Sequence, residues 1–199
     1  MVGSFSGTVD FNPGPASFNL SSSGNGDIFM LKLDSTGNFI WAKKMGGGGA
    51  DGCGFQCPDG AGNFYIAETF QNTVDFDPGP GTYNVTGYGS YFAKYTDSGD
   101  FIWVKTIQNP GGASPLIFDM KLDTAGTWDL YMTGLFVDTV DFNAGPAIHN
   151  LYSLGSSDVF IMRYDTSGTM AWAKSMGGFY SSEGHNLAMD PSGSGDIYT

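Results

Sequence analysis

The stretch GTVDFNPGP at Gly7–Pro15 is written three times along this chain. It returns as NTVDFDPGP at Asn72–Pro80 and as DTVDFNAGP at Asp138–Pro146, at intervals of 65 and 66 residues. A fixed spacing of this length is the sequence signature of a repeat architecture, in which one supersecondary unit is copied along the chain. We therefore expect one repeat array over residues 1–199. Its units lie approximately at residues 2–67, 68–133 and 134–199.

The same succession of segments follows each copy of the phrase. First comes DIFMLKL, SYFAKY or DVFIMRY, then a short turn containing Gly, then a second segment with the pattern Trp-x-Lys. In the first of these, Phe29, Leu31 and Leu33 alternate with Lys32 on the opposite side, which is typical of a strand. A second, less regular hairpin completes each unit. Each unit is thus predicted to form four antiparallel strands.

Composition supports an all-β fold and excludes some partners. The chain has 199 residues, with 31 glycines, 15% aromatic residues and only 14% charged residues, which favours many short strands and turns. The formal net charge of −12 opposes binding to nucleic acid or to an anionic membrane surface. No apolar run is long enough to predict membrane insertion, and no signal-peptide pattern is present.

Four-stranded antiparallel units with periodic glycine and aromatic residues indicate a β-propeller, in which each unit is one blade. A four-stranded blade needs about 40 to 50 residues. The repeated phrase therefore occupies surplus chain, and we expect it to form a loop on the rim of each blade, between the second and third strands. A β-helix would have a much shorter period, a helical solenoid needs a 3.6-residue pattern, and a β-sandwich would not repeat its own sequence.

The order of these motifs carries a family resemblance. The succession TVDF-x-PGP, then D-I/V-F-x-x-K/R-x-D-x-x-G-x-x-x-W-A-K, then M-G-G resembles the seven-bladed β-propeller repeats (SBBP repeats) of large exported bacterial surface proteins. The resemblance implies an extracellular or cell-surface scaffold and no defined ligand. The middle unit departs from the pattern, because IQNPGGASPLIF replaces the Met-Gly-Gly of the other two units, which predicts a loop of different shape.

The two ends of the sequence read as halves of one unit. Thr199 joined to Val2 gives DIYTVGSF, which matches DLYMTGLF at Asp129–Phe136. We therefore expect one blade to be split between the N- and C-termini. Since a propeller typically has at least about four blades, two chains are expected to associate into a homodimer with a six-bladed ring. The alternative is that the chain is an excerpt from a longer array.

The rim phrase also contains candidate metal ligands. Each copy places two oxygen-bearing side chains two residues apart beside turn carbonyls, as a hard cation such as calcium requires. These candidates are Asp10, Asn12, Asp75, Asp77, Asp141 and Asn143. The alternative is that they cap the turn through hydrogen bonds to its backbone.

Binding and catalysis are the other functions considered. Aromatic residues in repeated loops are typical of lectin-like or adhesin-like surfaces, so a glycan or protein ligand is an alternative to a purely structural role. The candidates are Tyr83, Tyr88, Tyr152 and Tyr180. We do not expect an enzyme. His149 and His185 fall where other units have different residues, and a glycosidase pair of Glu68 and Glu183 is only a remote alternative.

Overall fold

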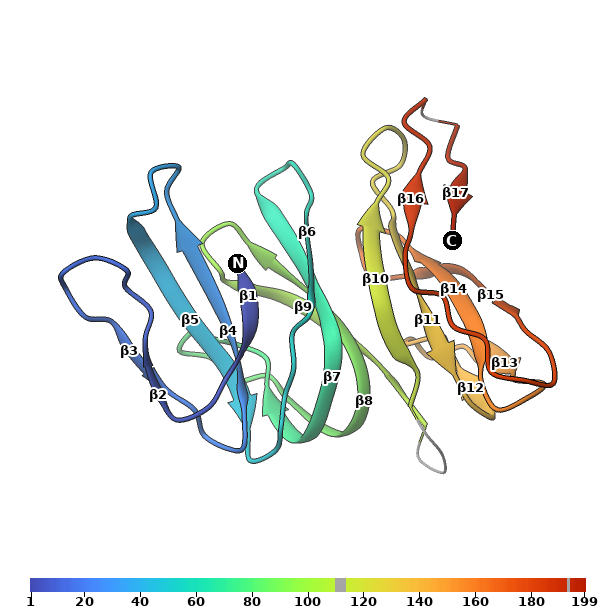
Figure 1. Cartoon of the computed structure of the whole chain (residues 1–199), viewed down its shortest axis with the longest axis horizontal. Helices are drawn as coiled ribbons and strands as arrows, with labels where there is room; N and C mark the ends of the chain where they lie inside the picture. Colours follow the sequence, from blue (N-terminus) through green and yellow to red (C-terminus); the bar gives the residue numbers. More distant parts are fainter. Residues whose placement is uncertain (110–113, 193) are drawn as a thin grey trace.

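The computed structural model describes residues 1–109, 114–192 and 194–199, which form strands and turns and no helix. The expectation of an all-β fold is confirmed. All ladders between the named strands are antiparallel. Figure 1 shows sheets standing side by side in a row along the long axis of the molecule.

The row consists of three groups of strands, which we call the first, middle and third sheets. The first sheet contains β1 (Val2–Phe5), β4 (Asp27–Leu33) and β5 (Phe39–Gly47). The middle sheet contains β6 (Phe55–Pro58), β7 (Asn63–Asp75), β8 (Asn84–Thr96) and β9 (Phe101–Gln108). The first and middle sheets are joined into one seven-stranded sheet, because the end of β5 pairs with β7, Gly46 with Asp75 and Gly47 with Val74. The third sheet contains β10 (Leu116–Leu122), β11 (Leu130–Phe136), β14 (Asp158–Tyr164) and β15 (Met170–Met176). The two strands predicted on either side of the short turn are therefore present in every unit.

The repeated phrase builds a hairpin at the rim of each sheet, which we call the rim arm. The rim arms of the first and third sheets are β2 (Thr8–Asp10) with β3 (Asn19–Ser21), and β12 (Thr139–Asp141) with β13 (Asn150–Tyr152). In the middle sheet the arm is continuous with the sheet, because β7 and β8, each 13 residues long, extend from the sheet into the arm without a break. The rim position expected for the phrase agrees with this arrangement.

The backbone conformation at the first position of the phrase explains why this position is Gly, Asn or Asp. Gly7, Asn72 and Asp138 have φ values of 72°, 64° and 60°, and each begins its rim arm. This left-handed backbone conformation is open to glycine and is tolerated by Asn and Asp better than by other residues. The chain thus turns into every rim arm through the same bend.

A recurring group of three aromatic rings fastens each rim arm to its sheet. In the third unit Phe142 of the phrase lies 5.3 Å from Phe136 of β11 and 4.9 Å from Phe160 of β14, between ring centroids. The corresponding groups are Phe5, Phe11 and Phe29 in the first unit and Phe70, Phe76 and Tyr91 in the middle unit. Edge-to-face aromatic pairs add to the burial energy of such side chains. The phrase is therefore repeated because its phenylalanine anchors the arm.

The core lies between neighbouring sheets. One cluster of buried side chains fills the space between the first and middle sheets, and another fills the space between the middle and third sheets. Trp41 and Trp103 each cover a turn glycine of the next sheet. A Cβ added to Gly99 would lie 2.8 Å from Trp41, and one added to Gly168 would lie 3.3 Å from Trp103.

The halves of the split unit lie apart in this structure. β16 (Ala188–Met189) and β17 (Ile197–Tyr198) form a separate two-stranded sheet, the C-terminal hairpin, which lies next to the third sheet. The other half is the first sheet, and Figure 1 shows it at the opposite end of the row. The middle-unit loop that replaces Met-Gly-Gly includes residues 110–113, which lie outside the described residues.

Candidate functional site

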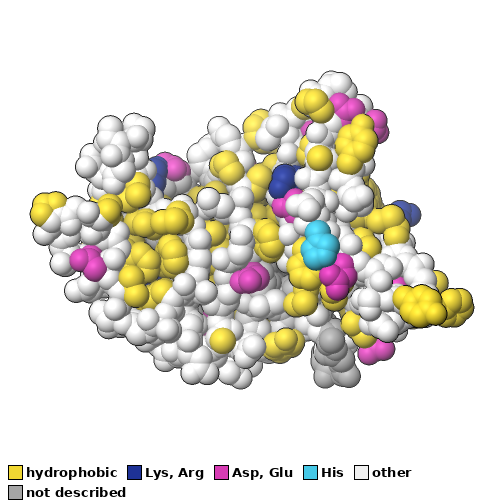
Figure 2. Space-filling model, in the orientation of Figure 1, with side chains coloured by type: hydrophobic (Ala, Val, Ile, Leu, Met, Phe, Trp, Pro, Cys, Tyr) yellow, Lys and Arg dark blue, Asp and Glu magenta, His cyan; other side chains and the backbone are white. Residues whose placement is uncertain are grey.

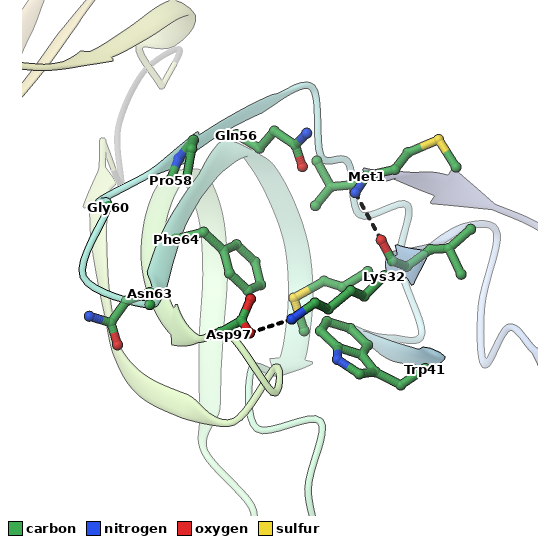
Figure 3. Close-up of a pocket in the computed structure, with 13 residues that line it drawn as sticks. Met1, Lys32, Trp41, Gln56, Pro58, Gly60, Asn63, Phe64 and Asp97 are labelled. Carbon is green, nitrogen blue, oxygen red and sulfur yellow. Dashed lines mark hydrogen bonds and ion pairs between the residues drawn. The ribbon is translucent and has the colours of Figure 1, made fainter. Parts of the chain in front are cut away.

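A cavity of about 270 Å³ opens between the first and middle sheets. Figure 3 shows the residues that line it. Met1, Leu31, Lys32 and Trp41 come from the first sheet and its N-terminus. The far wall belongs to the middle sheet and its turns, including Gln56, Pro58, Asn63, Phe64 and Asp97.

Two interactions cross or border this cavity. The Lys32 ammonium forms an ion pair with the carboxylate of Asp97, which lies in the turn after β8. The backbone N and O atoms of Met1 pair with the O and N atoms of Leu31, both at 2.8 Å. Both side chains of the Lys32–Asp97 pair are partly exposed, so solvent screens their attraction and its contribution to stability is small.

The cavity lies beside β4 where its ladder with β1 ends, and this ladder is shorter than the equivalent one in the third sheet. β11 pairs with β14 over seven residues, and β10 lies on the outer side of β11. In the first sheet β1 pairs with only four residues of β4, Asp27–Met30. Among the described strands, none pairs with Lys32 and Leu33 on the side where β1 lies, and we call these two residues the open edge of β4. The sequence did not predict this cavity, because its lining comes from two different units.

The candidate metal ligands serve as turn caps. Asp10 Oδ1 accepts hydrogen bonds from the backbone N–H groups of Asn12 (3.0 Å) and Phe18 (2.8 Å), and Asn12 Oδ1 accepts one from Gly14 (2.8 Å). Asp75 with Asp77 and Asp141 with Asn143 make the same bonds at the same distances. Each pair lies on its own rim arm. Among the described residues, no group of three or more His, Cys, Asp or Glu side chains is placed to hold a metal ion. Calcium binding stays a prediction.

The turn carboxylates make stability depend on pH. Hydrogen bonds from the Asn38 side chain, the Thr36 side chain and the Asn38 backbone hold the pKa of Asp34 far below its ordinary value. The backbone N–H groups of Phe18 and Asn12 lower the pKa of Asp10 in the same way. A carboxyl group with a lowered folded-state pKa stabilises the fold above its unfolded pKa of about 3.9, and this contribution disappears as the pH falls through the folded pKa.

We therefore expect the urea midpoint of unfolding to fall steadily as the pH is lowered from about 5 to about 2. Asp34→Ala removes the cap of the β4–β5 turn, so this variant should be less stable at neutral pH and should lose less stability on acidification. Ser35→Ala, at an exposed neighbour in the same turn, is the matched control and should follow the native curve. Parallel curves for the native protein and Asp34→Ala would contradict the assignment.

The candidate ligand-binding tyrosines are exposed but do not occupy equivalent positions. The exposed fractions are 47% for Tyr83, 51% for Tyr88, 62% for Tyr152 and 86% for Tyr180. Tyr83 lies in a rim arm against Phe101, with 4.8 Å between ring centroids, whereas Tyr88 lies within β8. Tyr152 belongs to β13, and Tyr180 follows β15. Ligand binding by these residues stays a prediction, and a single site repeated on each unit is not what their positions suggest.

The residues considered for catalysis have local partners. His149 Nε2 lies 3.1 Å from the carbonyl oxygen of Ala173. His185 Nε2 lies 3.0 Å from Glu183 Oε2, and its ring stacks on Phe118 at 5.1 Å. Burial raises the pKa of Glu68, which belongs to β7. Absence of catalysis stays a prediction, as does the remote glycosidase alternative.

Cys53 and Cys57 are both free thiols. Burial raises the pKa of the Cys53 thiol to about 12, so this thiol is unreactive at neutral pH.

Comparisons with known proteins add no assignment. No protein-family model matches the sequence, and a search of curated proteins found no similar one. In the part of the chain that the structure describes, no helix has the length and apolar character needed to cross a membrane.

Proposed function

We propose that this chain is a non-catalytic scaffold of the β-propeller type, in which each sheet is one blade, and that it completes its ring by associating with a second copy. The resemblance of the motifs to SBBP repeats supports a place in, or an origin from, an extracellular or cell-surface protein. The function is then to present rim arms and loops on a rigid ring. A site for one small substrate is not required.

Exposed apolar surface at both ends of the row of sheets carries this proposal. The outer face of the first sheet bears a cluster formed by Phe5, Phe11, Leu31 and Ala42, which are themselves buried, and the nearby side chains of Phe18 and Ile40 are exposed by 38% and 48%. Phe29, Leu33 and Phe39 pack against this cluster and are only partly buried. The corresponding face of the third sheet is buried against the middle sheet, where Phe160 and Met162 are fully covered. An unpaired sheet face of this kind favours association.

The other end of the row is also apolar. Six large hydrophobic side chains between residues 148 and 180 are exposed by at least 47%. They are Ile148, Tyr152, Leu154, Met176, Phe179 and Tyr180. Figure 2 shows hydrophobic side chains gathered at this end of the molecule. The alternative function, binding of a glycan or a protein ligand, would use the same aromatic side chains, and a glycan array with the native protein distinguishes the two.

Self-association is tested by the mass of the protein in solution. Size exclusion coupled to light scattering, repeated over a dilution series, should give twice the chain mass of 21.1 kDa at high concentration. Dissociation on dilution is consistent with the proposal. A mass of one chain at every concentration would contradict it, because three blades would then be stable with both ends exposed.

A further inference from the structure

We propose that the C-terminal hairpin, β16–β17, of a second copy completes the first sheet by pairing with the open edge of β4 and covering the cavity beside it. The inference rests on the proposed self-association and names the surfaces that carry it. A second copy is the occupant because the C-terminal hairpin of the same chain lies at the far end of the row, beyond the middle and third sheets (Figure 1).

Strand register identifies which residues would meet. In the third sheet Phe136 pairs with Asp158, and the ladder continues until Tyr131 pairs with Arg163 and Leu130 with Tyr164. In the first sheet Phe5 pairs with Asp27 in the same way, but the ladder with β1 stops at Met30, and Met1 is hydrogen-bonded to the next residue, Leu31. Met1 thus holds the place that Thr199 of a second copy would take, and the pairing requires Met1 to be displaced. The two remaining positions lie opposite Lys32 and Leu33. Asp196, Ile197 and Tyr198 repeat the sequence of Asp129, Leu130 and Tyr131, so Tyr198 would lie opposite Lys32 and Ile197 opposite Leu33.

In the middle and third sheets, the residue equivalent to Lys32 is a cation that lies beside an aromatic ring of the neighbouring strand. Arg163 lies 5.6 Å from the Tyr131 ring centroid and forms an ion pair of 2.5 Å with Asp129. In the middle sheet Lys94 lies 4.9 Å from the ring centroid of Tyr65, its cross-strand partner. A cation above an aromatic ring is favourable by about 0.5–2 kcal/mol, depending on how far it is desolvated.

Lys32 occupies the same position in the first sheet, where its cross-strand partner on β5 is Trp41. On the side where β1 lies, no aromatic residue of the described strands pairs with Lys32. Tyr198 and Asp196 of a second copy would supply the missing ring and carboxylate. Tyr198 is 62% exposed, and Asp196 is exposed as well. The pair that Lys32 now makes with Asp97 holds the cation beside the open edge.

The C-terminal hairpin is already held in place on the third sheet. Leu187, Met189 and Ile197 pack against Tyr131, Ile161 and Trp172. The hairpin has a ladder only between β16 and β17, so among the described strands the other edge of β17 has no partner. A second copy therefore meets a strand edge that its own fold has positioned.

Two glycines mark further contacts that the ring would make. Gly37 is the turn residue equivalent to Gly99 and Gly168, which lie against Trp41 and Trp103 of the preceding sheet. A Cβ at Gly37 would meet no atom within 4 Å, and Trp172 of a second copy is the side chain equivalent to those tryptophans. The open edge and the uncovered turn thus face the same missing neighbour.

Gly178 occupies in the third unit the position that Gly47 occupies in the first unit. At Gly47, β5 approaches the rim arm of the middle sheet so closely that a Cβ would lie 1.8 Å from the Thr73 carbonyl oxygen. A Cβ at Gly178 would meet nothing within 4 Å. In the ring, Thr8 in the rim arm of a second copy would lie there.

Disulfide trapping tests the register directly. Residues directly opposite on antiparallel strands have Cβ atoms about 4.5–5.5 Å apart, which a disulfide bridges with a small adjustment. In the variant carrying Lys32→Cys and Tyr198→Cys, mild oxidation should produce a reducible species of twice the chain mass. The matched control carries Lys32→Cys and Tyr88→Cys, which places the second thiol at an exposed tyrosine of the middle sheet, outside the proposed ladder and away from both ends of the row. The native protein controls for Cys53 and Cys57.

Each outcome separates the inference from the function it rests on. Cross-linking in the first variant alone supports the proposed pairing. A cross-link within one chain, or equal cross-linking in the control, would overturn it. If the native protein has twice the chain mass and the first variant does not cross-link, the scaffold proposal stands and this interface is wrong. If the native protein is a monomer at every concentration, both are wrong.

Gly178→Ala provides a second measurement that does not depend on thiols. The added Cβ should raise the dissociation constant of the pair by at least about tenfold, while the unfolding of the dilute single chain stays unchanged because the site is open there. Gly48→Ala, also at a glycine whose Cβ would meet nothing within 4 Å, is the control. An unchanged dissociation constant for Gly178→Ala would contradict the contact with the rim arm.

Discussion

Replacing Phe92 by alanine is expected to lower the free energy of unfolding by about 3–5 kcal/mol. Phe92 is fully buried in β8, between the middle and third sheets. Its ring centroid lies 4.6 Å from that of Tyr164 in β14 and 6.0 Å from that of Trp103. Because two sheets are built around the ring, they cannot close the cavity without moving relative to each other, and the cost should lie near the upper end of the range.

The matched control for Phe92→Ala is Phe179→Ala. Phe179 is 89% exposed, so at a dilution where the protein is a single chain the same substitution should change the free energy of unfolding by less than about 0.5 kcal/mol. Urea unfolding followed by tryptophan fluorescence at one protein concentration measures both variants. Similar losses for the two variants would mean that the space between the sheets does not hold the fold together.

Gly47→Ala is expected to destabilise the protein by about 1–3 kcal/mol. Gly47 pairs with Val74 where the end of β5 meets the rim arm of the middle sheet. A Cβ there would overlap the carbonyl oxygen of Thr73, at 1.8 Å, and that oxygen belongs to backbone that is held in place by its ladder with β8. The overlap can be relieved only if the rim arm moves away from the first sheet.

The neighbouring residue supplies the control for Gly47→Ala. Gly48 is exposed, and an added Cβ would meet nothing within 4 Å, so Gly48→Ala should leave the urea midpoint nearly unchanged. Hydrogen exchange at the amide groups of Val74 and Asp75 reports the same event locally, and it should be faster in Gly47→Ala. Unchanged exchange there, together with an unchanged midpoint, would contradict the close contact between β5 and the rim arm.

Much of the fold could be predicted because the same residue types recur at the same positions. The Trp-x-Lys segments became β5, β9 and β15, and the phrase became the rim arms, since alternation and turn residues are local signals. The phenylalanine of the phrase also recurs, but only the structure shows that it closes a group of three rings. Its partners come from strands that are separated by the whole rim arm.

The interactions between units could not be predicted. Lys32 and Asp97 form an ion pair across two sheets, and the sequence gives no sign of it, because the residues equivalent to Asp97 in the other units, Ser35 and Thr166, are not acidic. The Asp and Asn residues of the phrase matched two chemistries equally well, and only their bonds to backbone N–H groups show that they cap turns. The merging of the middle rim arm with β7 and β8 likewise depends on neighbouring strands.

A crystal structure of the associated protein tests the central claim most directly, because it shows how many blades surround the axis. We expect a closed ring of two chains related by a two-fold axis, with the C-terminal hairpin of each chain beside the open edge of β4 in the other. Lys32 should then lie over the ring of Tyr198. An open row of three sheets with Lys32 and Leu33 facing solvent, or a ring closed by one chain alone, would contradict the account.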